Sequence, residues 1–363
     1  MKAIVLCAGK ATRLRPLTNT RAKPLVPVAN KPILLHLIEQ ITDAGIFDIG
    51  IVVSPETGPQ VKQLIGNSCP SKSEITYILQ LEPLGLAHAV IMSQDFLTDS
   101  SFLMFLGDNL IEGGVKDFVT RFTIDHPDAS IMLKEVPNPC AFGVAELDDS
   151  GQVIGLEEKP KKPKSNLILV GAYLFTPEIH QFIAQISPSK RGELEITDAI
   201  QKLLASGKDV RSYTLSGRWL DIGNKEDLLM ANAFLLQQHL DSGNQGSIDS
   251  MSQITDPVLI GAGTTIENCT IKGPTIIAEG CHLKDSSIGP LVSLGANTHI
   301  EHSTMDNSMI LGGCHFAHLK HLTNSVIGKN TEIMGNSDAQ AANTLVLFLG
   351  DDSKIHLSKS TES

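Results

Sequence analysis

The sequence has no long apolar run and no paired cysteine motif, and these absences exclude several classes of protein. No hydrophobic segment approaches the roughly 20 residues of a membrane span. The first apolar run has only the length of a strand, so we expect no secretory leader. The six cysteines lie far apart without a C-x-x-C pair, which argues against a disulfide framework or a zinc ribbon and favours reduced thiols in the cytoplasm. The net charge of −11 argues against a nucleic-acid partner.

Acidic side chains are also absent from the first 37 residues, although the protein as a whole is acidic. Residues 2–8 form a short apolar run that predicts a buried strand, and the loop that follows, 8–13, consists of small residues and ends in a cation. Small residues let backbone N–H groups approach an anion closely. The basic residues of this segment are Lys2, Lys10, Arg13, Arg15, Arg21, Lys23 and Lys31. The pattern suggests a polyphosphate substrate, although neither a P-loop nor a G-x-G-x-x-G motif is present.

The order of residues in this segment is more specific than its charge. Composition alone would make a basic loop near a terminus a solvated surface. However, the string AGKATRLRPLT at 8–18, followed by AKP at 22–24 and KP at 31–32, resembles the signature of the sugar-1-phosphate nucleotidylyltransferases. One departure is Ala11, which stands where many members of that family have glycine.

The resemblance implies roles for individual residues of the signature. Ala8, Gly9 and Lys10 would bind the nucleoside triphosphate. Arg13 would stabilise charge on the α- and β-phosphates and on the leaving pyrophosphate, and Lys23 would hold the triphosphate side.

Residues 1 to about 135 alternate strand and helix patterns. Strands are expected at 49–53, 75–79 and 101–106, and helices at 31–44 and 85–94. This alternation predicts an α/β fold with a Rossmann-like, parallel or mixed sheet that binds ligands at the carboxyl ends of its strands. The basic loop, Gln80 and Asp108 all fall at such ends.

Two aspartates suggest a metal site. Asp108 follows a predicted strand in the string GDN, and Asp221 lies in the string WLDIG. An aspartate after a strand is often only a turn former. Nucleotidyl transfer, however, needs a hard divalent cation that is held by one or two carboxylates and by the phosphates. The resemblance implies that Asp108 and Asp221 bind Mg²⁺. Trp219, the only tryptophan, is interpreted as a packing residue beside Asp221.

Three further strings resemble the sugar-side motifs of the family. They are AFGV at 141–144, GLEEKP at 155–160 and VGAY at 170–173. The substrate-binding positions implied in this part of the chain are Gly107, Gly143, Glu158, Lys159, Val170, Gly171 and Glu195.

The charged members of this set have distinct implied roles. Glu158 would accept sugar hydroxyls, and Lys159 would hold the phosphate of the sugar as a point charge. Glu195 matches the sugar-contacting glutamate of the family, but it also has a simpler interpretation in the acidic first turn of a helix at 196–206.

The string QLEPLGLAHA at 80–89 resembles most the long form of the glucose-1-phosphate thymidylyltransferases, in which a β-helix follows the catalytic domain. Gln80 and Gly85 would then read the base through hydrogen bonds to its edge. His88 stands where short-form members have glutamine, so the base and the sugar remain open. We expect dTTP and glucose 1-phosphate, with UTP or another pair as the alternative.

Beyond residue 255 the apolar residues recur at steps of five or six. Every third member of this series gives Ile260, Ile277, Leu294, Leu311 and Ile327, which are 17, 17, 17 and 16 residues apart. Three short sides per coil predict a left-handed parallel β-helix of hexapeptide type, which favours a homo-oligomer. The expected domains are a catalytic domain at 1–240 that ends in a helix at 224–240, a linker at 241–254, a β-helix at 255–345 and a tail at 346–363.

Six of the twelve histidines lie in the predicted β-helix, three of them at 315, 318 and 321. A metal site or a histidine base for acyl transfer would be the functional interpretations. Surface histidines are the simpler one, because a spacing of three does not put side chains on one face of a β-helix. Two alternatives therefore stay open: a non-catalytic regulatory homologue that binds sugar nucleotides, and a bifunctional enzyme with acyl transfer in the β-helix.

The implied reaction is in-line attack of a sugar-1-phosphate oxygen on the α-phosphorus of the nucleoside triphosphate, with release of pyrophosphate. The nucleophile is already an anion, so positioning and charge neutralisation would carry the rate without a general base. The residues expected to do this are Arg13, Lys23, Asp108, Lys159 and Asp221.

Overall fold

The computed structural model describes residues 1–9, 11–68, 73–335 and 344–357. The chain falls into two compact units. The first comprises Met1–Lys10, Ala22–Leu25 and Ile33–Asp221, and the second comprises Ala11–Arg21, Val26–Pro32 and Ile222–Ser363. Two short N-terminal segments are therefore grouped with the C-terminal part of the chain, a division that differs from the contiguous domains expected above.

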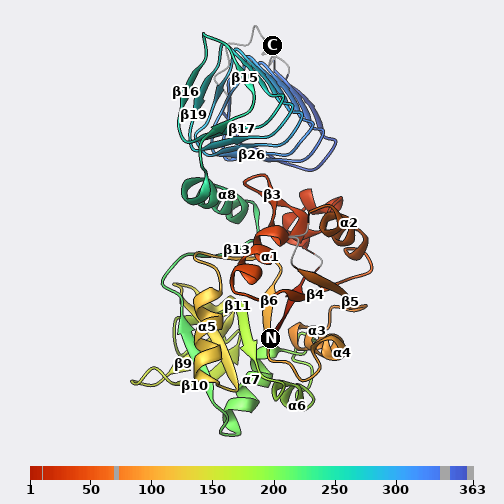
Figure 1. Ribbon diagram of the computed structural model, residues 1–363, viewed down its shortest axis with the longest axis vertical. Coiled ribbons are helices and arrows are strands. Elements are labelled where there is room, and N and C mark those ends of the chain that lie inside the picture. The colour runs from red at the N-terminus through yellow and green to blue at the C-terminus, as the bar shows by residue number, and fades with distance from the viewer. Residues whose placement is uncertain (10, 69–72, 336–343, 358–363) are drawn as a thin grey trace, which may run out of the picture. The chain divides into compact units, whose positions relative to one another are not determined.

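A mixed sheet, nine-stranded in the part of the chain described, forms the centre of the first unit (Figure 1). Its strands are β1 (Lys2–Leu6), β4 (Asp48–Val53), β5 (Glu74–Leu79), β6 (Phe102–Leu106), β8 (Ala129–Glu135), β9 (Gly143–Leu147), β10 (Val153–Glu158), β11 (Leu167–Phe175) and β12 (Val210–Thr214). The order is β10-β9-β11-β6-β1-β4-β5, with β8 between β11 and β12. Strands β6, β1, β4 and β5 are parallel, as the alternation predicts, whereas β11 runs antiparallel to β6.

Helices occupy the connections between these strands. They are α1 (Ile33–Asp43), α2 (Gly58–Ser68), α3 (Leu86–Met92), α4 (Gln94–Leu97), α5 (Lys116–Asp125), α6 (Ile179–Ile183) and α7 (Ile196–Ala205), with short 3-10 helices η3 (Lys23–Leu25) and η4 (Pro139–Ala141). Helix α1 buries the predicted apolar face, including Leu37 and Ile41, and Gly45 follows it with a φ of +83°.

The expected start of α1 was wrong by two residues. Lys31 and Pro32 do not form its first turn but the short strand β3 (Lys31–Pro32), which pairs with β2 (Pro27–Val28) in a hairpin of the second unit. A proline has no N–H group, and the edge of a small hairpin is a place where a strand tolerates it.

The core of the first unit lies on both faces of the sheet. Phe102 of β6 and Phe175 of β11 are fully buried, and their ring centroids lie 5.5 Å apart. Burying one such side chain contributes about 1.5–3 kcal/mol. This core keeps the strands, and therefore their polar ends, in a defined register.

Helix α8 (Lys225–His239) opens the continuous part of the second unit. A capping box starts it, since Asn224 accepts from Asp227 N, and the Asp227 carboxylate accepts from the main chain of Asn224. The predicted helix at 224–240 is therefore present, but polarity and burial do not coincide along it: Asn232 is buried and Met230 is 54% exposed.

After α8 the second unit continues as a left-handed β-helix with three parallel sheets (Figure 1). The first sheet contains β14 (Gly243–Asn244), β17 (Val258–Ile260), β20 (Thr275–Ile277), β23 (Val292–Leu294), β26 (Ser308–Ile310), β29 (Val326–Ile327) and β32 (Phe348–Leu349). The second contains β15 (Ser247–Ile248), β18 (Thr265–Glu267), β21 (His282–Lys284), β24 (His299–Glu301), β27 (His315–Ala317), β30 (Glu332–Met334) and β33 (Lys354–His356). The third contains β16 (Gln253–Thr255), β19 (Thr270–Lys272), β22 (Ser287–Ile288), β25 (Thr304–Met305), β28 (His321–Leu322) and β31 (Thr344–Leu345).

The apolar series of the sequence forms the interior of this β-helix, with one correction. Ile260, Ile277 and Leu294 pair in the predicted order. The next member is Ile310, which pairs with Leu294 and then with Ile327, so the assignment of Leu311 was wrong. The adjacent residues are both buried, and the apolar pattern alone did not distinguish them.

The β-helix also extends beyond both expected limits. The polar segment 241–254, expected to be a linker, carries β14 and β15 and most of β16, which pair with the next coil. Likewise β32 and β33, in the expected tail, pair with β29 and β30. Polar turn residues obscured these coils in the sequence because each strand is only two or three residues long.

The corners of the coils explain much of the polar composition. Asn268, Asp285, His302 and His318 all have positive φ values between 46° and 57°. Asn, Asp and His adopt this left-handed conformation more readily than most residues. Two of the histidines singled out by the sequence lie elsewhere: His315 is on β27, and His321 is on β28, where its Nε2 lies 2.7 Å from Asp306 Oδ2.

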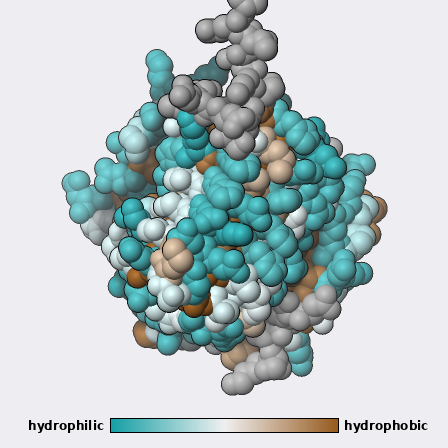
Figure 2. All heavy atoms as spheres, turned by 90° about the horizontal axis from the view of Figure 1, so that it is seen from above, coloured by the Kyte–Doolittle hydropathy of each residue, from teal (hydrophilic) through white to brown (hydrophobic). Residues whose placement is uncertain are grey.

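On the face drawn in Figure 2, hydrophilic side chains predominate, and the apolar ones form small separate spots. Among the residues that the structure describes, none of the helices combines the length and the apolar character needed to span a bilayer.

Candidate active site

Polar residues follow the carboxyl ends of the parallel strands in the first unit. Backbone hydrogen bonds keep these ends side by side: Gly107 N donates to Leu6 O at 3.0 Å, and Cys7 N donates to Val52 O at 2.8 Å. A Cβ atom at Gly107 would lie 2.6 Å from Leu6 O, so only glycine permits this close approach. The predicted residues at this edge are Ala8, Gly9, Gln80, Gly107 and Asp108, while Lys10 lies outside the described residues.

Asp108 is held by a cation and an amide. Lys23 Nζ lies 2.5 Å from Asp108 Oδ2, and Asn109 Nδ2 donates to Asp108 Oδ1 at 2.6 Å. The buried Asn109 side chain accepts in turn from Trp219 Nε1 at 2.6 Å and from Gly171 N at 3.3 Å. Asn109 therefore connects three residues that the sequence predicted separately, and Trp219 does more than pack beside the site.

A short antiparallel ribbon brings the second aspartate to the first. In it β7 (Asn109–Ile111) pairs with β13 (Trp219–Asp221), so that Asp221 lies opposite Asn109 and next to the position of Asp108.

Cys7 lies at the same edge of the sheet. Burial, together with the negative charge of Asp108, raises the pKa of Cys7, so its thiol stays protonated.

This donor set fits a hard divalent cation. Within the described ranges no group of three or more His, Cys, Asp or Glu residues could hold a metal by itself. Mg²⁺ does not need such a group, because it is usually bound by one or two carboxylates together with water and substrate phosphates. Asp108 and Asp221 match that pattern.

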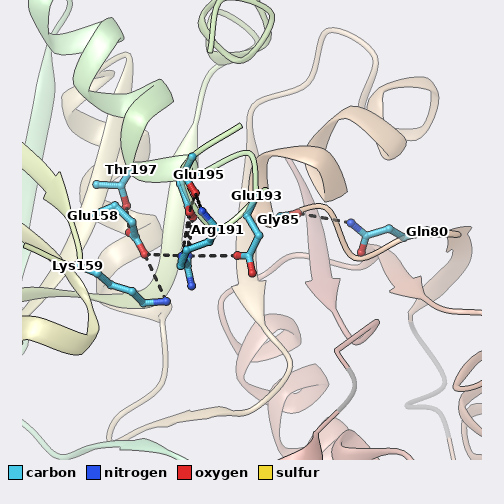
Figure 3. A network of polar contacts seen from close by, with 9 residues as sticks. Gln80, Gly85, Glu158, Lys159, Arg191, Glu193, Glu195 and Thr197 are labelled. Carbon is cyan, nitrogen blue, oxygen red and sulfur yellow. Dashed lines mark hydrogen bonds and ion pairs between the residues drawn. The ribbon is translucent and has the colours of Figure 1, made fainter. Parts of the chain in front are cut away.

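A second polar cluster surrounds Arg191 (Figure 3). Its Nη2 donates to both oxygens of Glu195, at 2.8 and 2.9 Å, and lies 3.1 Å from Glu193 and 3.4 Å from Glu158. Thr197 Oγ1 donates to Glu158 Oε2 at 2.8 Å. Two of the carboxylates that the sequence predicted at the sugar side, Glu158 and Glu195, are therefore brought together by one cation.

The surroundings of Glu158 in this cluster change its pKa in opposing directions. Burial raises the pKa of Glu158; the hydrogen bond from Thr197 opposes this shift, and the charge of Glu195 adds to it. Lys159 Nζ lies only 3.6 Å from Glu158 Oε1, yet the Lys159 side chain remains 37% exposed. Its ammonium group can therefore reach a phosphate without losing all contact with the glutamate.

The predicted glycines of this region have packing reasons of their own. A Cβ atom at Gly143 would lie 2.8 Å from Thr197 Oγ1 and 3.2 Å from Glu158 Oε2. At Gly171 it would lie 2.7 Å from the side chain of Leu106. Val170 is fully buried, so its side chain faces the core and only its backbone could contact a substrate.

The amide of Gln80 has a defined orientation. Its Nε2 lies 3.5 Å from Gly85 O and 3.0 Å from His88 Nδ1. A carbonyl oxygen can only accept, so the NH₂ group must face Gly85, and His88 then accepts at Nδ1. Gln80 is buried, and this arrangement leaves its Oε1 as the acceptor for a ligand.

The loop that carries Gly85 is paired with the segment that carries Glu195. Leu194 N donates to Leu84 O at 2.8 Å, and Ala87 N donates to Leu194 O at 3.1 Å. Gly85 has a φ of +107°, and a Cβ atom there would lie 2.4 Å from Leu194 O. The predicted base-reading and sugar-binding residues therefore share one backbone connection.

Arg13 belongs to the second unit, in the 3-10 helix η1 (Thr12–Leu14). The preceding Ala11 has a φ of +48°, a left-handed conformation that costs an L-residue about 1–2 kcal/mol and explains why glycine is favoured at this position. A Cβ atom at Gly223 would lie 3.1 Å from Arg13 Nη1, so glycine provides the room for the guanidinium group.

Sequence reasoning missed Asn109, Arg191 and Thr197 as site residues. A signal was available for one of them: Arg191 precedes Glu195 by four residues in a stretch with two glutamates, and a buried carboxylate needs a cation. The roles of Asn109 and Thr197 depend on partners 62 and 39 positions away, which local patterns do not reveal.

Comparison with known proteins gave consistent results. Residues 2–238 match the nucleotidyl transferase family. A glucose-1-phosphate thymidylyltransferase of Streptomyces griseus is 46% identical over 358 residues, which cover 99% of this chain and 100% of the relative. The bifunctional protein GlmU of Methanocaldococcus jannaschii is 37% identical over 91% of this chain and 78% of its own length. A solved Bacillus anthracis chain, proposed to be a glucose-1-phosphate thymidylyltransferase and in complex with a sucrose, is 33% identical with a TM-score of 0.61, and the match covers 67% of this chain and 98% of that one.

Proposed function

The chain belongs to the nucleotidyl transferase family, and we propose that dTTP and glucose 1-phosphate are its substrates. The reaction is transfer of a nucleotidylyl group from a nucleoside triphosphate to a sugar 1-phosphate. An oxygen of the sugar phosphate attacks the α-phosphorus, and the bond from the α-phosphorus to the bridging oxygen of pyrophosphate breaks. Both reactants are anions, so neutralising their charge is the main task of the protein.

The proposed roles divide between the clusters described above. Lys23 and Arg13 neutralise charge on the triphosphate, and Lys159 holds the incoming phosphate. Glu158 and Glu195 accept hydroxyl groups of the sugar, and Ala8, Gly9 and Gly107 supply backbone beside the phosphates. Gly143, Val170 and Gly171 supply backbone at the sugar.

Asp108 and Asp221 are proposed to hold Mg²⁺, which would lower the negative charge of the α-phosphate. Asn109 fixes the orientation of the Asp108 carboxylate through a hydrogen bond of 2.6 Å. The Lys23 ammonium group contacts the same carboxylate, so Lys23 and Mg²⁺ would together neutralise the negative charge of Asp108.

The observation that carries the choice of base is the orientation of the Gln80 amide. With Nε2 directed at Gly85 O and His88 Nδ1, Oε1 is available to accept a hydrogen bond. Thymine and uracil present an N3–H donor, whereas cytosine presents an unprotonated N3 that Oε1 would repel. A buried site strongly rejects a base that leaves one of its polar groups unpaired or repelled. The preference for dTTP over UTP is supported by the full-length identity with relatives named thymidylyltransferases.

The test is pyrophosphate release with Mg²⁺ across dTTP, UTP, ATP, GTP and CTP against glucose-, mannose-, glucosamine- and N-acetylglucosamine 1-phosphates. We expect the highest kcat/KM for dTTP with glucose 1-phosphate. Gln80→Ala should lower kcat/KM for dTTP and bring the dTTP/CTP ratio toward one, while His88→Gln should retain most of that ratio because glutamine also offers an acceptor. A maximum at another base would contradict the proposal, and no turnover with any pair would favour a non-catalytic homologue.

We further propose a cytoplasmic, homo-oligomeric protein. The described cysteines are all unpaired, with Cys7, Cys269, Cys281 and Cys314 buried and Cys140 exposed, which suits a reducing compartment. Stacked coils of a β-helix offer flat sides for association with a second copy.

A further inference from the structure

Asp351 lies in the last coil of the β-helix, between β32 and β33, and contacts the N-terminal segment 11–21 of the same unit. Its Oδ2 accepts from Thr20 Oγ1 at 2.7 Å. Arg21 Nη2 donates to both carboxylate oxygens, at 2.9 and 2.7 Å, and Oδ1 also accepts from Lys329 N at 2.8 Å. One carboxylate therefore joins the coil to a residue 330 positions earlier in the chain.

This ion pair is partly buried. The side chains of Arg21 and Asp351 are 11% and 10% exposed. Burial would raise the pKa of Asp351, but the hydrogen bonds from Thr20 and Arg21 outweigh it and hold the pKa below its ordinary value. Removing one partner of such a pair leaves the other charge buried without compensation, so the contact strongly constrains both segments.

Further contacts brace the segment between the ion pair and Arg13. Gly350 packs against Pro16, since a Cβ atom at 350 would lie 3.2 Å from Pro16 Cβ. Thr18 Oγ1 donates to Ala11 O at 2.8 Å, which closes the loop two residues before Arg13. The position of the arginine is thereby tied to the last coil.

The other N-terminal segment of this unit, 26–32, is held in a similar way. Asn30 Nδ2 donates to Leu294 O of β23 at 2.7 Å. Ala29 N donates to Asn232 Oδ1 of helix α8 at 3.0 Å. The β-helix contacts segment 11–21, and the β-helix and α8 both contact segment 26–32.

We propose that Asp351 is a positioning residue for nucleotidylyl transfer: the last coil of the β-helix holds the signature segment 11–21 and thereby sets the position of Arg13. The inference rests on the proposed function of Arg13. It gives the β-helix a direct part in the reaction, because this domain supplies the base on which a phosphate-binding loop is built.

The experiment compares Asp351→Asn and Arg21→Gln with Asp352→Asn in the full-length enzyme. Asp351→Asn retains an acceptor for Lys329 N, and Arg21→Gln breaks the same pair from the loop side, so a loss common to both does not come from a damaged coil. Asp352 is the matched control: it is the neighbouring, exposed carboxylate, and its contact is with Asn330 Nδ2 at 3.0 Å. The readouts are kcat, KM for each substrate, the thermal midpoint, and amide hydrogen exchange of residues 11–21.

Both pair-breaking variants should lose on the order of tenfold to a hundredfold in kcat, because displacement of a charged group by about 1 Å has that cost. They should also exchange faster at 11–21, while Asp352→Asn keeps the wild-type values of both. In an Arg13→Ala background, Asp351→Asn should add no further loss of kcat, since it acts through Arg13. Independent, multiplying losses would overturn the proposal, as would a wild-type kcat in both variants. Failure of the proposed function is recognised separately, because Arg13→Ala alone would then keep its activity.

Discussion

Both units contain parallel strands, but the residues that follow these strands differ between the two units. In the first unit the strands β6, β1, β4 and β5 end at one edge, and the residues beyond them include the polar Gln80 and the charged Asp108. In the described part of the β-helix, corners of similar conformation follow the strands of successive coils. Thr264 Oγ1, for example, donates to Ala278 O of the next coil at 2.7 Å and accepts from Cys281 N at 3.1 Å.

Polar groups are paired in different ways in the two regions. Repetition lets the β-helix satisfy its polar groups internally, as when Ser286 Oγ accepts from Ser303 N at 3.1 Å. The sheet edge instead brings charged side chains close together, and such a group of charges can bind a substrate. Substitutions in the β-helix should therefore lower the stability of the fold, whereas substitutions at the sheet edge or in the signature should lower kcat.

The largest effect is expected in the β-helix interior. Phe316 is fully buried between Ile300 and Ile333, so Phe316→Ala should lower the free energy of unfolding by about 3–5 kcal/mol. Chemical denaturation monitored by circular dichroism measures this. His315→Ala, on the same strand but exposed, is the control and should change it by less than about 0.5 kcal/mol. Equal effects of the two would contradict the division between interior and surface.

Arg13→Ala should give the opposite result. Loss of a group that stabilises transition-state charge should lower kcat by about 10²–10³, with an unfolding free energy close to that of the wild type. Steady-state pyrophosphate release measures kcat. Arg15→Ala, which removes an exposed charge two residues away, should cost much less. A near-normal kcat for Arg13→Ala would remove this residue from the mechanism.

Asn109 tests whether the predicted aspartates work as a metal site. Asn109→Ala removes the hydrogen bond to Asp108 and should raise the Mg²⁺ concentration for half-maximal activity by roughly 10–100-fold, as expected for loss of a residue that orients a ligand. Trp219→Phe removes only the neighbouring Nε1–H donor and should have a smaller effect. An unchanged Mg²⁺ dependence in Asn109→Ala would indicate that Asp108 does not bind the metal.

Glu158 tests whether a residue proposed to bind the sugar lowers the stability of the fold. Because its pKa is raised on folding, Glu158 stabilises the fold fully below its unfolded pKa, and that stability is lost as the pH rises through the folded pKa. Glu158→Gln should therefore raise the thermal midpoint at pH 7, with a difference that disappears in acid. It should also raise KM for glucose 1-phosphate about tenfold, through loss of a charged acceptor. A lower midpoint at pH 7 would contradict this sign.

The smallest expected effect is a pH dependence of the stability of the β-helix. Burial, and then the charges of His282 and His315, lower the pKa of His299, while Glu301 opposes the shift. The rings of His282 and His299 lie 4.7 Å apart on neighbouring coils. The folded state resists protonation here, so stability should be full above the ordinary histidine pKa and should fall slightly as the pH drops below it. His299→Gln should reduce the change in thermal midpoint between pH 7.5 and 5.5, and an unchanged slope would exclude this residue as its source.

Much of both units could be predicted from local patterns. The strand that leads into the signature, the helix at 196–206 and the apolar columns of the β-helix were all recognised, because hydrophobic periodicity and turn residues are properties of short segments. Errors occurred where a local pattern had two solutions. Leu311 and Ile310 are both apolar, and the polar residues of 241–254 serve equally well as a linker or as corners of a coil.

The type of fold, the reaction class and the residue types at the sheet edge could be predicted from ordered strings and their charges. Which side chains meet became visible only in the folded chain: Asn109 with Trp219, Arg191 with Glu158, and Arg21 with Asp351. The physical reason is that these contacts are worth little in an unfolded, solvated chain. They become strong only when folding brings the partners together and removes their charges and polar groups from water.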